Sequence, residues 1–79
     1  MRLDKYLKVS RLIKRRTVAN EACDNGRVSI NGKVAKASTE VKAGDVISIS
    51  FGNKEVKVEV LDVTETVRKE EAKELFKYL

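Results

Sequence analysis

The sequence predicts an α+β fold in which two N-terminal helices pack on a small, bent antiparallel sheet and a C-terminal helix follows. Three observations predict it. Apolar residues recur at helical spacing early in the chain, alternate with polar residues through its middle, and return to helical spacing near the end. The 79 residues are expected to form a single domain, because a chain of this length buries one thin core.

The first helix is predicted by Leu3, Tyr6 and Leu7, which lie at i, i+3 and i+4 and therefore share one side. Ser10 interrupts the pattern. The opposite side of this helix is basic and carries Arg2, Lys5 and Lys8.

The stretch "RLIKRR" that follows is predicted to be a turn, with Leu12 and Ile13 directed inward. Thr17 is the expected N-cap of a second helix, "VANEACDN", and Gly26 stands where a helix C-terminus needs a left-handed residue. The predicted inner face of this helix consists of Val18, Ala19, Ala22 and Cys23.

Turn residues then divide the chain into short strands. Asn31-Gly32 separates two alternating runs and predicts a hairpin, because a type I′ turn needs positive φ at both central residues. Turns at residues 43–45 and at Gly52-Asn53 bound the strand "VISISF" and lead into "EVKVEVLDV". The final segment, residues 68–79, predicts a helix whose apolar face holds Ala72, Leu75, Phe76 and Leu79.

Charge is unevenly distributed along the chain. The net charge is +5, but residues 1–36 alone carry ten basic and three acidic residues. This asymmetry favours a nucleic-acid or other anionic partner. With only two Tyr and two Phe, the chain has few rings on which single-stranded bases could stack, so recognition of the backbone and shape of double-helical RNA is favoured over recognition of single strands. Charge alone does not distinguish RNA from DNA as the partner. A membrane partner is disfavoured, because no apolar run approaches ~20 residues and none resembles a signal peptide; a cytoplasmic location is expected.

The residues needed for catalysis are largely missing. The chain has no histidine, its four glycines are dispersed at turns, and Cys23 is its one cysteine, which excludes an internal disulfide and a thiolate metal cage. Cys23 is interpreted as a core residue and Asp45 as a turn residue. The acidic cluster Glu70, Glu71 and Glu74 is interpreted as solvated charge. We therefore expect neither an enzyme nor a bound cofactor or metal.

The ordered series "RLDKYL…SR…KRRTVANEACDNGRVSINGKVAKAS…VKAGDVI", over roughly residues 1–50, resembles the S-four-type RNA-binding domain, the αL motif. The resemblance implies a module that binds structured RNA through two helices and the following hairpin, without catalysis. Residues 51–79 would form a strand and helix tail. A free-standing copy with this tail is most similar to the RqcP (YabO-type) branch, and it also resembles the small heat-shock branch, whose long basic C-terminal extension it lacks.

The RqcP-type resemblance implies a role in ribosome-associated quality control. The protein would bind obstructed large ribosomal subunits, contact large-subunit rRNA and peptidyl-tRNA, stabilise the tRNA in the P site, and support a partner factor that adds C-terminal alanine tails. A monomer is expected. The alternatives are an RNA-binding adaptor for a separate RNA-modifying enzyme, docked through the acidic C-terminal half, a heat-shock-type recycling factor, and a regulator that binds mRNA or DNA.

Eight cations are candidate RNA contacts, and each is alternatively a solvated surface charge. Arg2 and Arg16 rank first. Asp4 is either the residue that orients a nearby arginine or a plain acid in the first turn of a helix. The full candidate set is Arg2, Lys5, Arg11, Lys14, Arg15, Arg16, Arg27 and Lys36.

Overall fold

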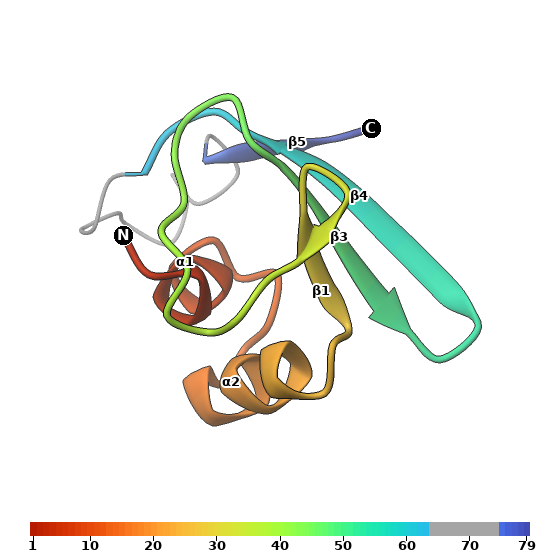
Figure 1. Ribbon diagram of the computed structural model, residues 1–79. Coiled ribbons are helices and arrows are strands. Elements are labelled where there is room, and N and C mark those ends of the chain that lie inside the picture. The colour runs from red at the N-terminus through yellow and green to blue at the C-terminus, as the bar shows by residue number, and fades with distance from the viewer. Residues whose placement is uncertain (64–74) are drawn as a thin grey trace.

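The computed structural model describes residues 1–63 and 75–79 (Figure 1). Within them, two helices precede a five-stranded antiparallel sheet whose strand order is β2-β1-β3-β4-β5. The helices are α1 (Leu3–Val9) and α2 (Arg16–Asp24), and the strands are β1 (Val28–Ile30), β2 (Lys33–Val34), β3 (Val46–Phe51), β4 (Lys54–Val60) and β5 (Phe76–Tyr78). The two N-terminal helices and the antiparallel sheet confirm the predicted fold class.

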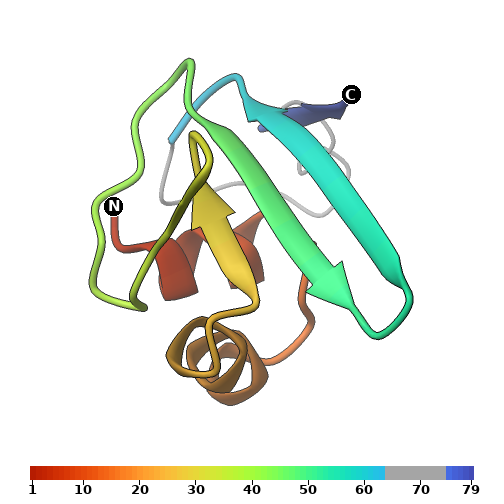
Figure 2. The same ribbon diagram turned by 45° about the vertical axis from the view of Figure 1, so that its right-hand side comes forward.

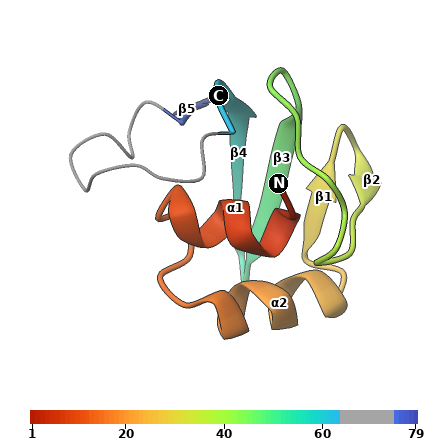
Figure 3. The ribbon, with the colours of Figure 1, turned by 90° about the vertical axis from the view of Figure 1, so that its left-hand side faces the viewer.

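Both helices lie on the same side of the sheet, as Figure 3 shows. The predicted inner side of α1 is confirmed, because Leu3, Tyr6 and Leu7 are fully buried. They meet sheet residues that alternate along β3 and β4, where the fully or almost fully buried side chains are Ile47, Ile49, Val58 and Val60. Between the helices, Ile13 is buried and Leu12 is half-buried, so this turn is also directed inward as predicted.

Helix α2 differs from its prediction at two places. It begins at Arg16 and its N-cap is Arg15, with no capping side chain, so Thr17 is not the cap. Val18 is 47% exposed, whereas Ala19 and Cys23 are buried. Ala19 and Cys23 are four residues apart and share a side, and Val18 lies about 100° around the helix from Ala19. The helix ends as predicted, because Gly26, which follows the C-cap Asn25, has φ +73°.

The predicted turns between strands are present. Asn31 and Gly32 both have positive φ, at 52° and 84°, as a type I′ turn requires. The Asn31 side chain also accepts a hydrogen bond from the Val46 N–H at 2.9 Å and donates one to Asp45 Oδ1 at 3.1 Å. Asp45 is a turn residue, since its Oδ2 accepts a hydrogen bond from the Lys42 N–H at 2.9 Å.

The end of the chain corrects the predicted C-terminal helix. Residues 76–78 form β5, which pairs with β4 in the register Val58↔Tyr78 and Val60↔Phe76. Leu75 is buried and its carbonyl accepts the Tyr6 hydroxyl proton at 2.6 Å, whereas Leu79, predicted to lie on the apolar face, is 64% exposed. The predicted helical residues 68–74, with the acidic cluster Glu70, Glu71 and Glu74, lie outside the described residues. No helix in residues 1–63 or 75–79 has the length and apolar character to cross a membrane.

Candidate nucleic-acid interface

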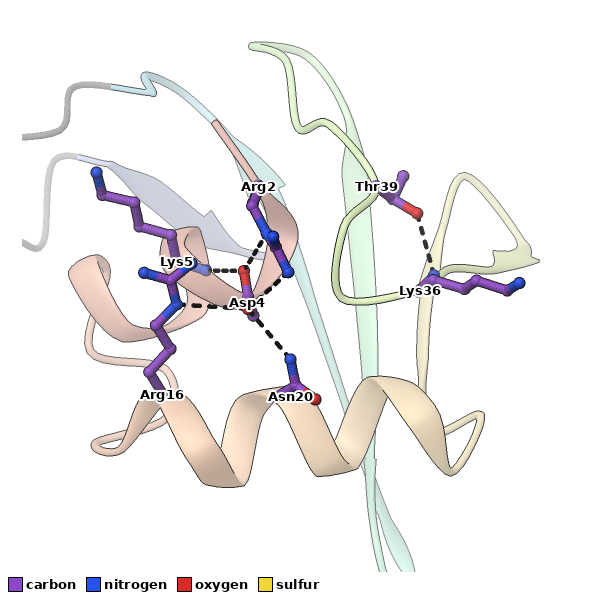
Figure 4. Close-up of polar contacts among 7 residues, drawn as sticks. All are labelled: Arg2, Asp4, Lys5, Arg16, Asn20, Lys36 and Thr39. Atoms are coloured by element: carbon purple, nitrogen blue, oxygen red, sulfur yellow. Dashed lines mark hydrogen bonds and ion pairs between the residues drawn. The ribbon is translucent and has the colours of Figure 1, made fainter.

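The main polar feature between α1 and α2 is a buried carboxylate with several donors around it (Figure 4). Asp4 lies in the first turn of α1 and is 2% exposed. Its Oδ1 accepts hydrogen bonds from Arg2 Nε at 3.2 Å and from the Lys5 backbone N–H at 2.8 Å. Its Oδ2 accepts from Arg2 Nη2 at 3.4 Å, Arg16 Nε at 3.4 Å and Asn20 Nδ2 at 3.3 Å. We call Asp4, Arg2, Arg16 and Asn20 the Asp4 cluster.

The surroundings of Asp4 keep it ionised. Burial alone would raise its pKa, but the hydrogen bonds from Asn20, Arg16 and the Lys5 backbone, together with the Arg16 charge, outweigh burial and hold the pKa below its usual value. A carboxylate is therefore present at neutral pH to fix the two arginines. Asp4 acts as the orienting residue, which resolves the two interpretations that its sequence position left open.

The two arginines of the Asp4 cluster come from different elements. Arg2 directly precedes α1 and Arg16 is the first residue of α2. Their side chains are 52% and 47% exposed, although each contacts a carboxylate that is 3% exposed. Each guanidinium thus has one side tethered to protein and the rest at the surface, which is a suitable arrangement for binding an external anion through several N–H groups.

A surface groove of about 500 Å³ lies beside these arginines. Its walls bring together three of the predicted cations, Arg2, Lys5 and Arg16, and one acid, Glu40; Met1 and Ser38 complete the lining. We call this feature the cationic groove. Three cationic side chains against one acidic side chain favour an anionic, phosphate-bearing ligand over a cationic ligand.

The far wall of the groove comes from the loop between β2 and β3, which is fixed to the start of α1. The Leu3 N–H donates to the Thr39 carbonyl at 2.8 Å, the Asp4 N–H donates to the Ala37 carbonyl at 3.2 Å, and Arg2 and Glu40 form a β-bridge. These bonds satisfy two of the first N–H groups of α1. These two N–H groups are therefore not free to bind an anion in the groove.

The other candidate cations are not all brought to this groove. Arg11, Lys14 and Arg15 lie exposed in the segment that joins α1 to α2. Arg27 follows the C-terminal end of α2, whereas Arg16 begins that helix, so about 13 Å of helix separates them. Lys36 is exposed, and its side chain points away from the Asp4 cluster in Figure 4.

Sequence reasoning missed Asn20, Ser38 and Glu40. A signal was available for Asn20, because it follows Arg16 by four residues and therefore shares its side of α2. Ser38 and Glu40 come from an irregular loop and reach the groove only through the loop's hydrogen bonds to α1, for which the sequence has no periodic signal.

Cys23 has the core character that was predicted. It is 2% exposed, and burial, followed by the negative charges of Asp4 and Asp24, raises the pKa of its thiol to about 11. The thiol is therefore protonated at neutral pH. Among the residues that the structure describes, no group of three or more His, Cys, Asp or Glu side chains is arranged to hold a metal ion.

The N-terminal part of the chain, which contains the cationic groove, matches an S4 domain. The family model with that description matches residues 1–47, which include α1, α2, the first hairpin and every residue that lines the groove. The similarity to full-length proteins is more specific. The RQC P-site tRNA stabilizing factor of Halalkalibacterium halodurans is 64% identical over 76 residues, which cover 96% of this chain and 86% of the relative. The protein with the same name from Bacillus subtilis is 57% identical over 79 residues, which cover 100% and 92%.

A solved structure shows the same fold. The trimeric structure of Vibrio cholerae Heat Shock Protein 15 aligns with a TM-score of 0.91 and 31% sequence identity, over 100% of this chain and 81% of that chain. The chain therefore belongs to the S4-domain family and, within it, to the family of RQC P-site tRNA stabilizing factors.

Proposed function

We propose that this protein is a non-enzymatic RNA-binding factor of ribosome-associated quality control that binds obstructed large ribosomal subunits and stabilises tRNA in the P site. The observation that carries the proposal is the similarity, over nearly the whole chain, to proteins named RQC P-site tRNA stabilizing factor. The cationic groove supports it on independent physical grounds, because it presents three cations on a fixed backbone to a phosphate-rich partner.

The proposed contact residues fall into two ranks. Arg2, Lys5 and Arg16 line the cationic groove and are proposed to bind phosphates of rRNA or peptidyl-tRNA. Arg11, Lys14 and Arg15 are proposed to extend this contact along the exposed segment before α2. Arg27 and Lys36 remain proposed contacts, and their positions away from the groove require RNA that reaches further around the molecule.

The proposed setting of the activity is the cytoplasm. There the protein would act as a monomer and would support a partner factor that adds alanine tails to the stalled chain. The monomer is a separate proposal, checked by measuring the mass of the purified protein by light scattering. Alanine-tail synthesis in a reconstituted system, with and without the protein, would test the partner relation.

The proposal is tested first by cosedimentation of the protein with purified large subunits, with and without peptidyl-tRNA, over a series of salt concentrations. Arg16→Ala is expected to weaken binding by about 10-fold or more, because a hydrogen bond to a charged group contributes about 1.5–3 kcal/mol. It should also lower the slope of log K against log salt by roughly 0.7–0.9.

The matched control is Lys57→Ala, which removes one positive charge from an exposed side chain that pairs with Glu55 on the sheet. This variant should bind as the unaltered protein does. Equal losses in both variants would reduce the effect to net charge and contradict a specific groove contact. Binding that is indifferent to peptidyl-tRNA would contradict P-site stabilisation.

A second candidate function has its own support in the similarity to Heat Shock Protein 15. It is a heat-shock-type factor that recycles large subunits. The two candidates separate in the alanine-tailing assay, because a recycling factor would leave tail synthesis unchanged.

A further inference from the structure

A second surface with nucleic-acid-binding character lies at the closed end of the β3–β4 hairpin. Phe51 ends β3 and pairs with Lys54, which begins β4, so Gly52 and Asn53 form a two-residue turn. Gly52 has φ +59°, a backbone angle that residues other than glycine rarely adopt. In Figures 1 and 2 this turn lies apart from both helices. We call Phe51, Gly52, Asn53, Lys54 and the neighbouring Arg27 the hairpin-tip surface.

The Phe51 ring is exposed where its strand would suggest a core position. Residues 47, 49 and 51 are every second residue of β3 and therefore lie on the same face, where Ile47 and Ile49 are fully buried. Phe51 is 45% exposed, because this face continues beyond the part of the sheet that the helices cover. A single exposed apolar side chain is ordinary in a folded protein, so the charges around it determine what the ring fits.

One cation lies beside Phe51 on its own face of the sheet, and a second lies at the end of the neighbouring strand. Lys54 is the cross-strand partner of Phe51 and therefore lies on the same face of the sheet. Arg27 lies opposite Ser50 at the end of β3, because its carbonyl accepts a hydrogen bond from the Ser50 N–H at 2.8 Å and the next residue, Val28, pairs with Ile49. In this register Arg27 lies on the face of Ser50, opposite the face of Phe51. Both side chains are exposed. The neighbouring acid Glu55 pairs with Ser50 on the opposite face, where Lys57 Nζ lies 3.7 Å from its carboxylate.

We propose that the hairpin-tip surface is a second RNA contact, in which Phe51 stacks on one unpaired base and Lys54, on the same face, binds a phosphate beside it. Arg27 adds positive charge at the end of the neighbouring strand. The inference rests on the proposed function for its partner and adds a site of a different kind, since none of the described residues that line the cationic groove is aromatic. An exposed ring beside a lysine fits a base with its phosphodiester backbone. A protein partner would favour an apolar surround, which this ring lacks.

The two surfaces differ in what they recognise. The groove, proposed to bind phosphates, lies at the start of α2, and the hairpin-tip surface lies beyond the other end of that helix. A folded RNA that contacts both must offer backbone at one place and an unstacked nucleotide at the other. Such a partner is an RNA with a bulge, a loop or a single-stranded end next to a helix.

The test uses large subunits loaded with peptidyl-tRNA and compares Phe51→Ala, Phe51→Leu and Phe51→Tyr by cosedimentation, with base-specific chemical probing of the RNA. Loss of one stack should weaken binding by roughly 5- to 150-fold in the Ala and Leu variants. Phe51→Tyr keeps the ring and should bind within about 2-fold of the unaltered protein. The salt slope should stay unchanged in all three, whereas Lys54→Ala should lower it by roughly 0.7–0.9.

Tyr78→Ala is the matched control, because Tyr78 is a 69% exposed aromatic residue on the edge strand β5, paired with Val58 rather than with the tip. The Tyr78→Ala variant should bind large subunits as the unaltered protein does, and circular dichroism should show that all variants are folded. Support requires that Phe51→Ala also removes protection of an individual base. The inference is overturned if Phe51→Ala binds normally, if Phe51→Leu binds as well as Phe51→Tyr, or if binding weakens without any change at a base. Arg16→Ala in the same assay keeps the outcomes apart: if that variant alone loses binding, the proposed function stands and the hairpin-tip contact falls.

Discussion

The substitution Asp4→Asn separates the orienting role of Asp4 from the effect of charge. It raises the net charge from +5 to +6, so a purely electrostatic account predicts tighter binding to RNA. The Asp4 cluster predicts the opposite, because the carboxylate accepts hydrogen bonds from Arg2, Arg16 and Asn20, and an asparagine keeps only one of its two acceptor oxygens. We expect binding to large subunits to weaken several-fold despite the added positive charge.

The same substitution should lower stability by about 2 kcal/mol. Breaking a buried ion pair costs about 3–5 kcal/mol, and losing one partner of a buried hydrogen bond costs about 1–3 kcal/mol. The smaller range applies here, because both arginine side chains are about half exposed and can turn to water when the carboxylate is removed. Urea unfolding monitored by circular dichroism measures the difference.

The pH dependence provides an internal check. The pKa of Asp4 is lower in the folded protein than its ordinary value of 3.8, so its ionised form contributes stability above that value. That contribution is lost as the pH falls through the folded-state pKa. The stability difference between the unaltered protein and Asp4→Asn should therefore be full at pH 6 and shrink below about pH 4. A difference that is constant from pH 6 to pH 2.5, or tighter RNA binding by the variant, would refute the reasoning.

Three further predictions concern single residues. Arg11→Gly should raise stability by about 1 kcal/mol in urea unfolding, because Arg11 has φ 67° and glycine adopts this conformation without strain. Unchanged or lower stability would contradict this. The same variant should weaken subunit binding if the Arg11 side chain contacts RNA. Tyr6→Phe should cost about 1–2 kcal/mol in the same assay, because it removes the buried hydrogen bond to the Leu75 carbonyl, and a cost near zero would show that this bond contributes little. Cys23 should resist alkylation by iodoacetamide at pH 7.5 until the protein is unfolded in guanidinium, since the thiol is buried and its pKa is raised to about 11; rapid labelling of the folded protein would contradict this.

Local chemistry explains which parts of the fold the sequence could predict. Asn31-Gly32 specifies its hairpin because the positive φ values are a property of those two residues. The C-terminal strand is different. The spacing of Leu75, Phe76 and Leu79 matches a helix. In the structure, however, residues 76–78 pair with the outer edge of β4, and the Tyr6 hydroxyl donates a hydrogen bond to the Leu75 carbonyl. Both partners are remote in sequence, so periodicity alone gave the wrong element for residues 76–78.

The candidate site shows the same division. The basic residues are visible in the sequence, and their uneven distribution favours an anionic partner for the N-terminal half. Their grouping depends on Asp4, a charged residue that is nevertheless buried among the apolar residues of α1. Because Asp4 reaches across to Arg16 and Asn20, it selects Arg2 and Arg16 as one group. Arg27, equally basic, falls at the other end of α2.

Burial of Asp4 also explains why arginine suits positions 2 and 16 better than lysine. A guanidinium has five N–H donors, so one edge can bond Asp4 while another bonds a phosphate, and the side chain loses less conformational freedom per hydrogen bond formed. Because Asp4 already restricts the two arginine side chains, they lose less conformational entropy when RNA binds than unrestrained side chains would. This raises the affinity without any added contact. A lysine would supply the same charge, but its single ammonium would have to divide between the carboxylate and the phosphate. On this reasoning Arg16→Lys should retain most of the salt dependence of binding and lose most of the affinity that Arg16→Ala loses, a combination that charge alone does not produce.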